Sequence, residues 1–139
     1  MKSDGRLARM LHVLVHMGLL GGRETSERIA QMLNTNPVVV RRTLGALRKH
    51  GIVESEGGRG GGWRLTRALA QITVLDVQSA LIEGQMLPAP LSSDHPNCPV
   101  EQASNAILEH AHKLAEAELK KAYKATTLAH IAETAVSKA

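Results

Sequence analysis

The fold of this chain is decided by residues 25–67, TSERIAQMLNTNPVVVRRTLGALRKHGIVESEGGRGGGWRLTR. Residues 25–33 predict a short helix, because Thr25 can cap it and three apolar side chains fall on one of its faces. Those apolar side chains are Ile29, Ala30 and Leu33. Asn34 then interrupts the apolar spacing, so we expect the first helix to end there.

A second helix is predicted over residues 36–51. Asn36 can accept a hydrogen bond as N-cap, Pro37 suits the first helical position, and Gly51 can adopt the left-handed conformation that ends a helix. Its buried stripe should consist of the apolar residues at helical spacing, Val40, Leu44 and Leu47. Two short helices joined by a tight turn, the second one basic near its start, are typical of a helix-turn-helix.

Two short strands should follow, at residues 52–56 and 63–66, with a glycine-rich run between them at residues 57–62. This run, GGRGGG, is too rich in glycine for a helix and suits the tip of a hairpin. It could also be a plain flexible turn. It is not a phosphate-binding loop, because no Gly-Lys-Ser/Thr ending and no following helix accompany it. A helix-turn-helix followed by a hairpin predicts a winged helix.

The charge of the chain is unevenly distributed. Residues 1–68 hold 12 Lys or Arg and 5 Asp or Glu, a net +7, whereas residues 69–139 carry a net −3. All ten arginines lie in the first part. A basic half that coincides with a helix-turn-helix indicates binding to a phosphate backbone, although a solvated basic surface is the alternative.

The length and composition exclude several classes of protein. With 139 residues the chain suits about one domain with an appended element, and its near absence of aromatics calls for an aliphatic, helical core. A single cysteine excludes an intrachain disulfide framework. We find neither a signal-peptide pattern nor an apolar run near the ~20 residues of a membrane-spanning helix, and expect a cytoplasmic protein without membrane contact.

The chain resembles the Rrf-two family of bacterial winged helix-turn-helix transcription regulators. The resemblance rests on GIVESEGGRGGGWRLTR at residues 51–67, ITVLDV at residues 72–77, and NPVVVRRTLGALRKH at residues 36–50, which fits the recognition helix of that family. It covers roughly the first two thirds of the chain. Membership implies a homodimer that binds double-stranded DNA, often with a cysteine site that senses a signal.

Residues of the helix-turn-helix and wing are the candidates for DNA contact. Arg42, and then Arg41, are favoured because a long guanidinium can reach guanine edges or hold phosphates, and valines can touch thymine methyls. Alternatively, Val39 and Thr43 fill the core. The wing departs from the family, in which an arginine often stands at the position of Gly57 and a proline at that of Arg59. The predicted DNA-contacting residues are Thr25, Ser26, Asn36, Val38, Val39, Arg41, Arg42, Thr43, Arg59, Arg64 and Arg67.

Three regions are predicted along the chain: a winged helix-turn-helix domain at residues 1–84, an irregular linker at 85–100, and a dimerisation helix with a closing helix at 101–139. The first region includes a starting helix at about 4–20, capped by Ser3 or Asp4. It also includes a fourth helix that Thr73 and Asp76 start as a capping box and Gly84 ends. The predicted fold class is therefore mainly α, with a two-stranded wing and a long C-terminal helix.

The long helix, residues 101–124, carries a narrow apolar stripe among Glu and Lys. The preceding residues already supply a hydrophobic core. An apolar stripe of this length is therefore expected to pack against a helix of a partner subunit, rather than against the core of its own subunit. In the family this helix forms the dimer interface. The predicted interface residues are Ile107, Ala111, Leu114, Ala115, Leu119 and Ala122. We expect the last helix, residues 127–136, to close over the long one.

Cys98 is the one candidate for a sensor. Family members with an iron–sulfur cluster supply three cysteines before the long helix, so one cysteine predicts no such cluster and no other cofactor. His95 and Cys98 have H-x-x-C spacing, but His110 and His112 lie about 200° apart on a helix, so we predict no metal site either. Redox sensing by Cys98 and an incidental cysteine remain equal alternatives.

The sequence as a whole favours a dimeric, sequence-specific DNA-binding regulator, in the first place a repressor, over an enzyme. A small thiol enzyme built on Cys98 is disfavoured because no motif places a His–Asp pair beside it. A winged-helix protein–protein adaptor without DNA binding is disfavoured by the arginine bias of the first half.

Overall fold

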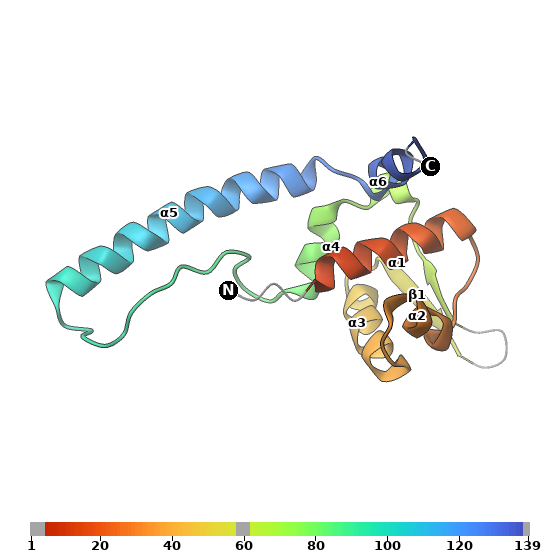
Figure 1. The fold of residues 1–139 in the computed structure, drawn as a ribbon, viewed down its shortest axis with the longest axis horizontal. Helices are drawn as coiled ribbons and strands as arrows, with labels where there is room; N and C mark the ends of the chain where they lie inside the picture. Colours follow the sequence, from red (N-terminus) through yellow and green to blue (C-terminus); the bar gives the residue numbers. More distant parts are fainter. Residues whose placement is uncertain (1–4, 58–61, 138–139) are drawn as a thin grey trace.

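The computed structural model, which describes residues 5–57 and 62–137, has a winged-helix body from which one long helix projects (Figure 1). In chain order the elements are α1 (Arg6–Leu20), α2 (Ser26–Leu33), α3 (Pro37–Lys49), β1 (Val53–Glu56), β2 (Gly62–Leu65), the short 3-10 helix η1 (Leu69–Gln71), α4 (Val74–Leu81), α5 (Pro99–Lys124) and α6 (Leu128–Ser137). Helix α3 packs on α2, α4 and β1. The predicted fold class, mainly helical with a two-stranded wing and a long C-terminal helix, is confirmed.

The two helices of the helix-turn-helix start at the predicted caps. Thr25 Oγ1 accepts a hydrogen bond from the backbone N–H of Arg28 at 3.1 Å. Asn36 Oδ1 likewise accepts from the backbone N–H of Val39 at 3.1 Å, with a proline in the first turn of α3. Between them, Asn34 adopts a left-handed conformation, φ 54°, that ends α2. The tight turn therefore follows from local sequence.

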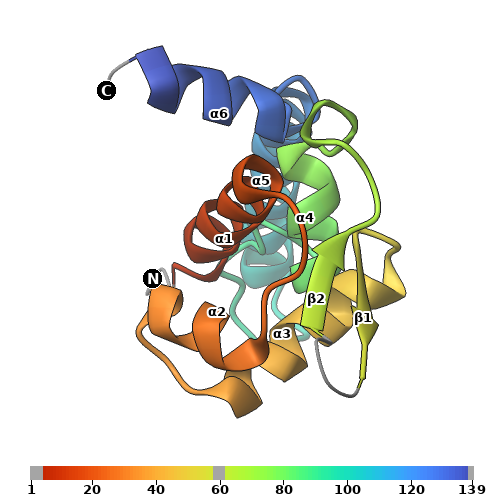
Figure 2. The ribbon, with the colours of Figure 1, turned by 90° about the vertical axis from the view of Figure 1, so that its right-hand side faces the viewer.

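The wing is an antiparallel pair whose ladder runs from Val53 opposite Leu65 to Glu56 opposite Gly62. The segment before α2 adds a short third partner, because the backbone groups of Glu24 and Trp63 exchange two hydrogen bonds of 2.9 and 2.8 Å. Gly62 adopts φ 146°, and a Cβ there would lie 2.6 Å from the carbonyl oxygen of Glu24. The wing is thus fastened to the segment ahead of α2 near the loop end of its ladder, by Gly62 and Trp63 (Figure 2).

The core is almost entirely aliphatic, and it gathers where α1, α3, α4 and the base of the wing meet. The predicted stripe on α3 is fully buried, and Trp63 packs into the same cluster with 6% of its surface exposed. The fully buried side chains are Met10, Val13, Leu14, Ile29, Val40, Leu44, Leu47, Ile52, Val53, Ile72, Val77 and Leu128. Burial of this surface supplies most of the stabilisation of the body.

The fourth helix has both hydrogen bonds of the predicted capping box. Asp76 N donates to Thr73 Oγ1 at 3.0 Å, and Thr73 N donates to Asp76 Oδ2 at 2.9 Å. Helix α4 ends at Leu81, three residues before the expected glycine, because Ile82 already adopts an extended conformation. The proposed caps of α1, Ser3 and Asp4, lie outside the described residues, and the helix is described from Arg6.

Helix α5 leaves the body as an arm of 26 residues, about 39 Å long at helical rise, and no residue in it is buried. It begins at Pro99, two residues earlier than expected, since proline is compatible with the first turn of a helix. Residues 82–98, an irregular segment that we call the strap, run outward from the end of α4 to the far end of the arm, where α5 begins and returns toward the body (Figure 1).

Side chains of α5 hold the strap by its backbone. Glu116 Oε1 accepts from Leu87 N at 2.9 Å. Asn105 bonds both backbone groups of Ser92, at 3.1 and 2.9 Å. Because these side chains lie on one side of α5, the strap covers that side and leaves the opposite side uncovered.

Helix α6 returns to the body. Its residues Leu128 and Ala132 are buried, and the helix packs against α1 and η1. The backbone N–H of Leu128 donates to Ile72 O at 2.9 Å, and that of Val74 donates to Thr126 O at 2.9 Å. We expected this helix to close over the long one, whereas its buried side chains complete the core of the winged helix.

Candidate nucleic-acid interface

The exposed side of α3 is apolar and basic. At 100° per residue, Val38, Arg42 and Lys49 lie opposite the buried stripe of that helix, and all three are exposed. Val38 has 56% of its surface exposed. A helix that presents such a side outward can enter a major groove.

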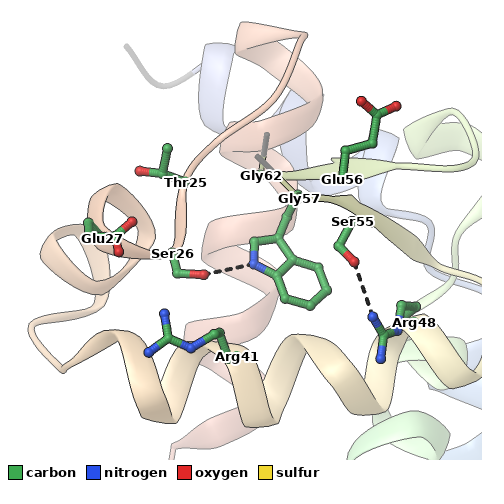
Figure 3. A pocket seen from close by; sticks show the side chains of 10 residues that line it. Thr25, Ser26, Glu27, Arg41, Arg48, Ser55, Glu56, Gly57 and Gly62 are labelled. Atoms are coloured by element: carbon green, nitrogen blue, oxygen red, sulfur yellow. Dashed lines mark hydrogen bonds between the residues drawn. The ribbon is translucent and has the colours of Figure 1, made fainter. Parts of the chain in front are cut away.

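Arg41 lies about 100° around the helix from Arg42 and therefore faces another surface. Together with Arg48, two turns further on, it borders an open groove of about 600 Å³ between α3, the start of α2 and the wing (Figure 3). Both guanidinium groups rise from α3 toward α2 and the strands in that view. The groove is lined by Thr25, Ser26, Glu27, Arg41, Arg48, Ser55, Glu56, Gly57, Gly62 and Trp63.

The groove has a net positive charge, because Arg41 and Arg48 line it and one of its two carboxylates, Glu56, forms an ion pair with Arg23 at 2.8 Å. Glu24, which lies outside the groove lining, is paired with Arg28 at 3.1 Å. The N-terminus of α2 adds a partial positive charge at the same edge. An open groove with a net positive charge suits an anionic polymer such as a phosphate backbone.

Four predicted contact residues have polar groups that are occupied within the protein, and one of them is Thr25, whose Oγ1 caps α2. Ser26 is buried, and its Oγ accepts a hydrogen bond from Trp63 Nε1 at 2.9 Å. Thr43 is half-buried and its hydroxyl donates to Val39 O at 2.9 Å. Asn36 is exposed, but its Oδ1 caps α3. The hydroxyl of Ser26 is therefore engaged by the tryptophan, although Ser26 lines the groove, and its contact with DNA stays a prediction.

The two described arginines of the predicted wing contacts, Arg64 and Arg67, lie close to carboxylates of the protein. Arg64 pairs with Glu54, its cross-strand neighbour. Arg67 is half-buried, donates to Gln71 O at 3.3 Å and lies 3.9 Å from the carboxylate of Asp76. Arg59 lies outside the described residues. Among the described arginines, Arg41 and Arg48 line the groove beside α3, whereas Arg64 and Arg67 line a second open groove next to the end of α1.

The sequence-based prediction did not include Arg48 or Lys49. Their positions carried a usable signal: Arg48 follows Arg41 by two helical turns, and Lys49 follows Arg42 at the same spacing, so each pair lies on one side of α3.

On α5, the side opposite the strap carries exposed apolar residues seven positions apart. Val100, Ile107 and Leu114 are 73%, 70% and 59% exposed. Of the predicted interface residues, Ala111, Ala115 and Ala122 are also exposed, whereas Leu119 is half-buried on the side that the strap follows. A seven-residue apolar spacing is the pattern of a helix that packs along another helix.

Cys98 is half-buried and forms the N-cap of α5. The backbone N–H groups of Glu101 and Val100, in the first turn of the helix, favour the thiolate and so lower the pKa of the Cys98 thiol.

Comparison with known proteins agrees with this geometry. The Rrf2 family model, described as an iron-dependent transcriptional regulator, matches residues 4–134 of the chain. YwnA of Bacillus subtilis, assigned as an HTH-type transcriptional regulator, is 36% identical over 107 residues, which cover 76% of this chain and 79% of YwnA.

Solved structures share the fold. A crystal structure assigned as a DNA-binding protein matches with a TM-score of 0.73 and 28% identity, and the match covers 91% of this chain and 97% of that one. CymR, the global cysteine regulator of Bacillus subtilis, matches with a TM-score of 0.66 and 24% identity over 96% of both chains. At that identity the likeness to CymR concerns the fold alone.

The iron in the family description does not fit the donors of this chain. The sequence has a single cysteine, and among the described residues no three His, Cys, Asp or Glu side chains lie close enough together to hold a metal ion. We therefore assign iron no role here. Within the same residues, no helix is both long enough and apolar enough to cross a membrane.

Proposed function

The chain belongs to the Rrf2 family of transcriptional regulators, and from this premise we propose that it binds operator DNA as a homodimer and represses transcription by covering a promoter. The observation that carries the proposal is the exposed side of α3, on which Val38, Arg42 and Lys49 lie opposite the buried stripe. Two such helices related by a two-fold axis would enter successive major grooves of an imperfect palindrome.

Two classes of contact are proposed within this interface. Arg42 reads base edges from the major groove, with Val38 against thymine methyls. Arg41 and the N-terminus of α2 hold phosphates along the groove beside it. The exposed apolar side of α5, with Ile107 and Leu114, packs against the same helix of a second copy.

The salt dependence of DNA binding tests this function against the adaptor alternative. If the dimer makes about 6–10 phosphate contacts, its affinity for a duplex should fall by about 10³–10⁵ between 50 and 200 mM salt. Fluorescence anisotropy with a labelled duplex measures it. A chain that binds no duplex at 50 mM salt would favour the adaptor.

Gly45 gives a prediction that separates folding from DNA binding. It lies within the outward side of α3, and a Cβ added there would meet nothing within 4 Å. Gly45→Ala should therefore raise the free energy of unfolding by about 1 kcal/mol, because alanine favours the helix. It should also weaken operator binding, because the added methyl group stands where we propose that α3 approaches the bases. Thermal unfolding and anisotropy measure the two effects. Unchanged or tighter operator binding would contradict the proposed approach.

We further propose that Cys98 makes the regulator responsive to peroxide. In the reaction the thiolate attacks one peroxide oxygen, the O–O bond breaks, and sulfenic acid and hydroxide are formed. The position of Cys98 at the junction of the strap and α5 would couple this change to the arm that we propose as the dimer contact. The thiol-enzyme alternative gains no support, since the relatives are transcriptional regulators.

The lowered pKa of Cys98 predicts the pH dependence of its reactivity. At a pH below the ordinary thiol pKa, a larger fraction of the folded protein carries thiolate, which is the reactive form. Alkylation by iodoacetamide should therefore reach half of its maximal rate at lower pH in the folded chain than in urea. As Cys98 is the only cysteine, mass spectrometry follows its alkylation without interference.

The Cys98→Ser variant should bind DNA as the parent does, and peroxide should not change its DNA binding. A variant whose DNA binding still responded to peroxide would exclude Cys98 as the sensor.

A further inference from the structure

Trp63, on strand β2 of the wing, contacts both helices of the helix-turn-helix, α2 and α3. Its indole Nε1 donates to Ser26 Oγ on α2 at 2.9 Å, and its backbone pairs with Glu24 ahead of that helix. The guanidinium carbon of Arg48, on α3, lies 5.9 Å from the centre of its ring. Trp63 is 6% exposed and belongs to the core cluster, so Arg48 covers a ring that the core already holds on its other sides.

Arg48 also reaches the other strand of the wing. Its Nη1 donates to Ser55 Oγ at 3.1 Å, and Ser55 is the residue directly opposite Trp63 in the ladder. The side chain of Arg48 therefore contacts both members of one cross-strand pair, Ser55 and Trp63. This pair lies two residues closer to the loop than the buried Val53. We call Arg48, Ser55 and Trp63 the clasp.

A guanidinium suits this double contact for a chemical reason. It is planar, so it can face an aromatic ring and donate a hydrogen bond in its own plane at the same time. A lysine ammonium in the same place keeps the positive charge but has no plane to lay against the ring.

We propose that Arg48 is a positioning residue, which fixes the wing against the recognition helix and thereby raises operator affinity. The inference rests on the proposed function, and it names a residue that acts through the wing rather than through a base. The wing and α3 must meet the duplex together, and a wing that is already held loses less conformational freedom on binding.

The alternative role for Arg48 is a phosphate contact, since it borders the same groove as Arg41. Three variants separate the two roles. Arg48→Lys keeps the charge and loses the planar contact, Arg48→Met loses both, and Ser55→Ala removes only the hydroxyl. Arg41→Met is the matched control, because it removes an arginine from the same wall of the groove without touching the clasp.

The first measurement needs no DNA. Trp63 is the only tryptophan, so its emission and its quenching by acrylamide report on the clasp alone. We expect Arg48→Lys and Arg48→Met to raise the quenching constant about twofold or more and by similar amounts, since the cover of the ring is lost in both. Arg41→Met should leave it unchanged. Equal quenching in all variants would overturn the proposal, whatever the chain binds.

The second measurement is operator affinity at several salt concentrations. If Arg48 positions the wing, both Arg48 variants should bind the operator about tenfold more weakly, and the slope of log affinity against log salt concentration should not change. Ser55→Ala should bind the operator more weakly than the parent, but by less than tenfold. For a phosphate contact, Arg48→Lys would bind like the parent and Arg48→Met would lower the slope by about one per subunit; this result would overturn the inference. Failure of the parent to bind any duplex would instead refute the proposed function, while the quenching result still decides whether Arg48 holds the wing.

Discussion

Replacing Arg42 by alanine is expected to remove most of the preference of this protein for its operator over random DNA. Arg42 lies on the outermost side of α3 and is exposed. A bidentate contact between an arginine and a guanine is worth about 1–3 kcal/mol of discrimination, and a two-fold symmetric dimer makes the contact twice, which gives about 2–6 kcal/mol. The variant should fold normally, since the side chain packs against nothing in the core.

The ratio of operator affinity to random-duplex affinity measures this effect. Arg41→Ala is the control, because it removes the same group from the adjacent residue, which faces the groove. We expect Arg41→Ala to weaken both duplexes alike and Arg42→Ala to weaken the operator far more. Equal losses on both duplexes for both variants would contradict the roles that we assign to the two arginines.

A carboxylate in the middle of the exposed side of α5 is expected to separate the subunits. In Leu114→Glu, two leucines of the dimer are replaced, and each buried leucine contributes about 1.5–3 kcal/mol. The uncompensated burial of two carboxylates adds a further cost. Since Leu114 is 59% exposed in the single chain, the variant should unfold at nearly the same temperature as the parent.

Sedimentation equilibrium gives the mass of the variant in solution. We expect a folded monomer, with operator affinity lowered by orders of magnitude because only one recognition helix can then bind at a time. Ala106→Glu places the same carboxylate about 80° around α5 from Leu114 and about 100° from Ile107, and this variant should remain dimeric. A dimeric Leu114→Glu variant would show that the apolar side of α5 is not the contact.

The local elements of this fold were predictable because each depends on a few neighbouring residues. Asn36 caps α3, Asn34 ends α2, and Thr73 with Asp76 starts α4, as side-chain chemistry predicted. The glycine run likewise predicted the hairpin that the two strands form.

Long-range partners were not predictable in the same way. Nothing adjacent to Ser26 in the sequence indicates that its hydroxyl accepts a hydrogen bond from Trp63, 37 residues away. The amphipathic pattern of α6 showed that one side is buried but not against which surface, and the surface proved to be α1 and η1. The contacts of Arg48 in the clasp were not predictable either, because they depend on the strand register that places Ser55 opposite Trp63.

Selection from a pool of random duplexes by the purified protein shows whether two copies read one operator, because it requires neither a known promoter nor a known signal. We expect an imperfect palindrome whose half-sites lie about one helical turn, roughly 10 base pairs, apart. Enriched sequences should also lose their advantage when Arg42 is replaced. Recovery of no common sequence, or of a single half-site bound by a monomer, would contradict the proposal that two copies read successive major grooves.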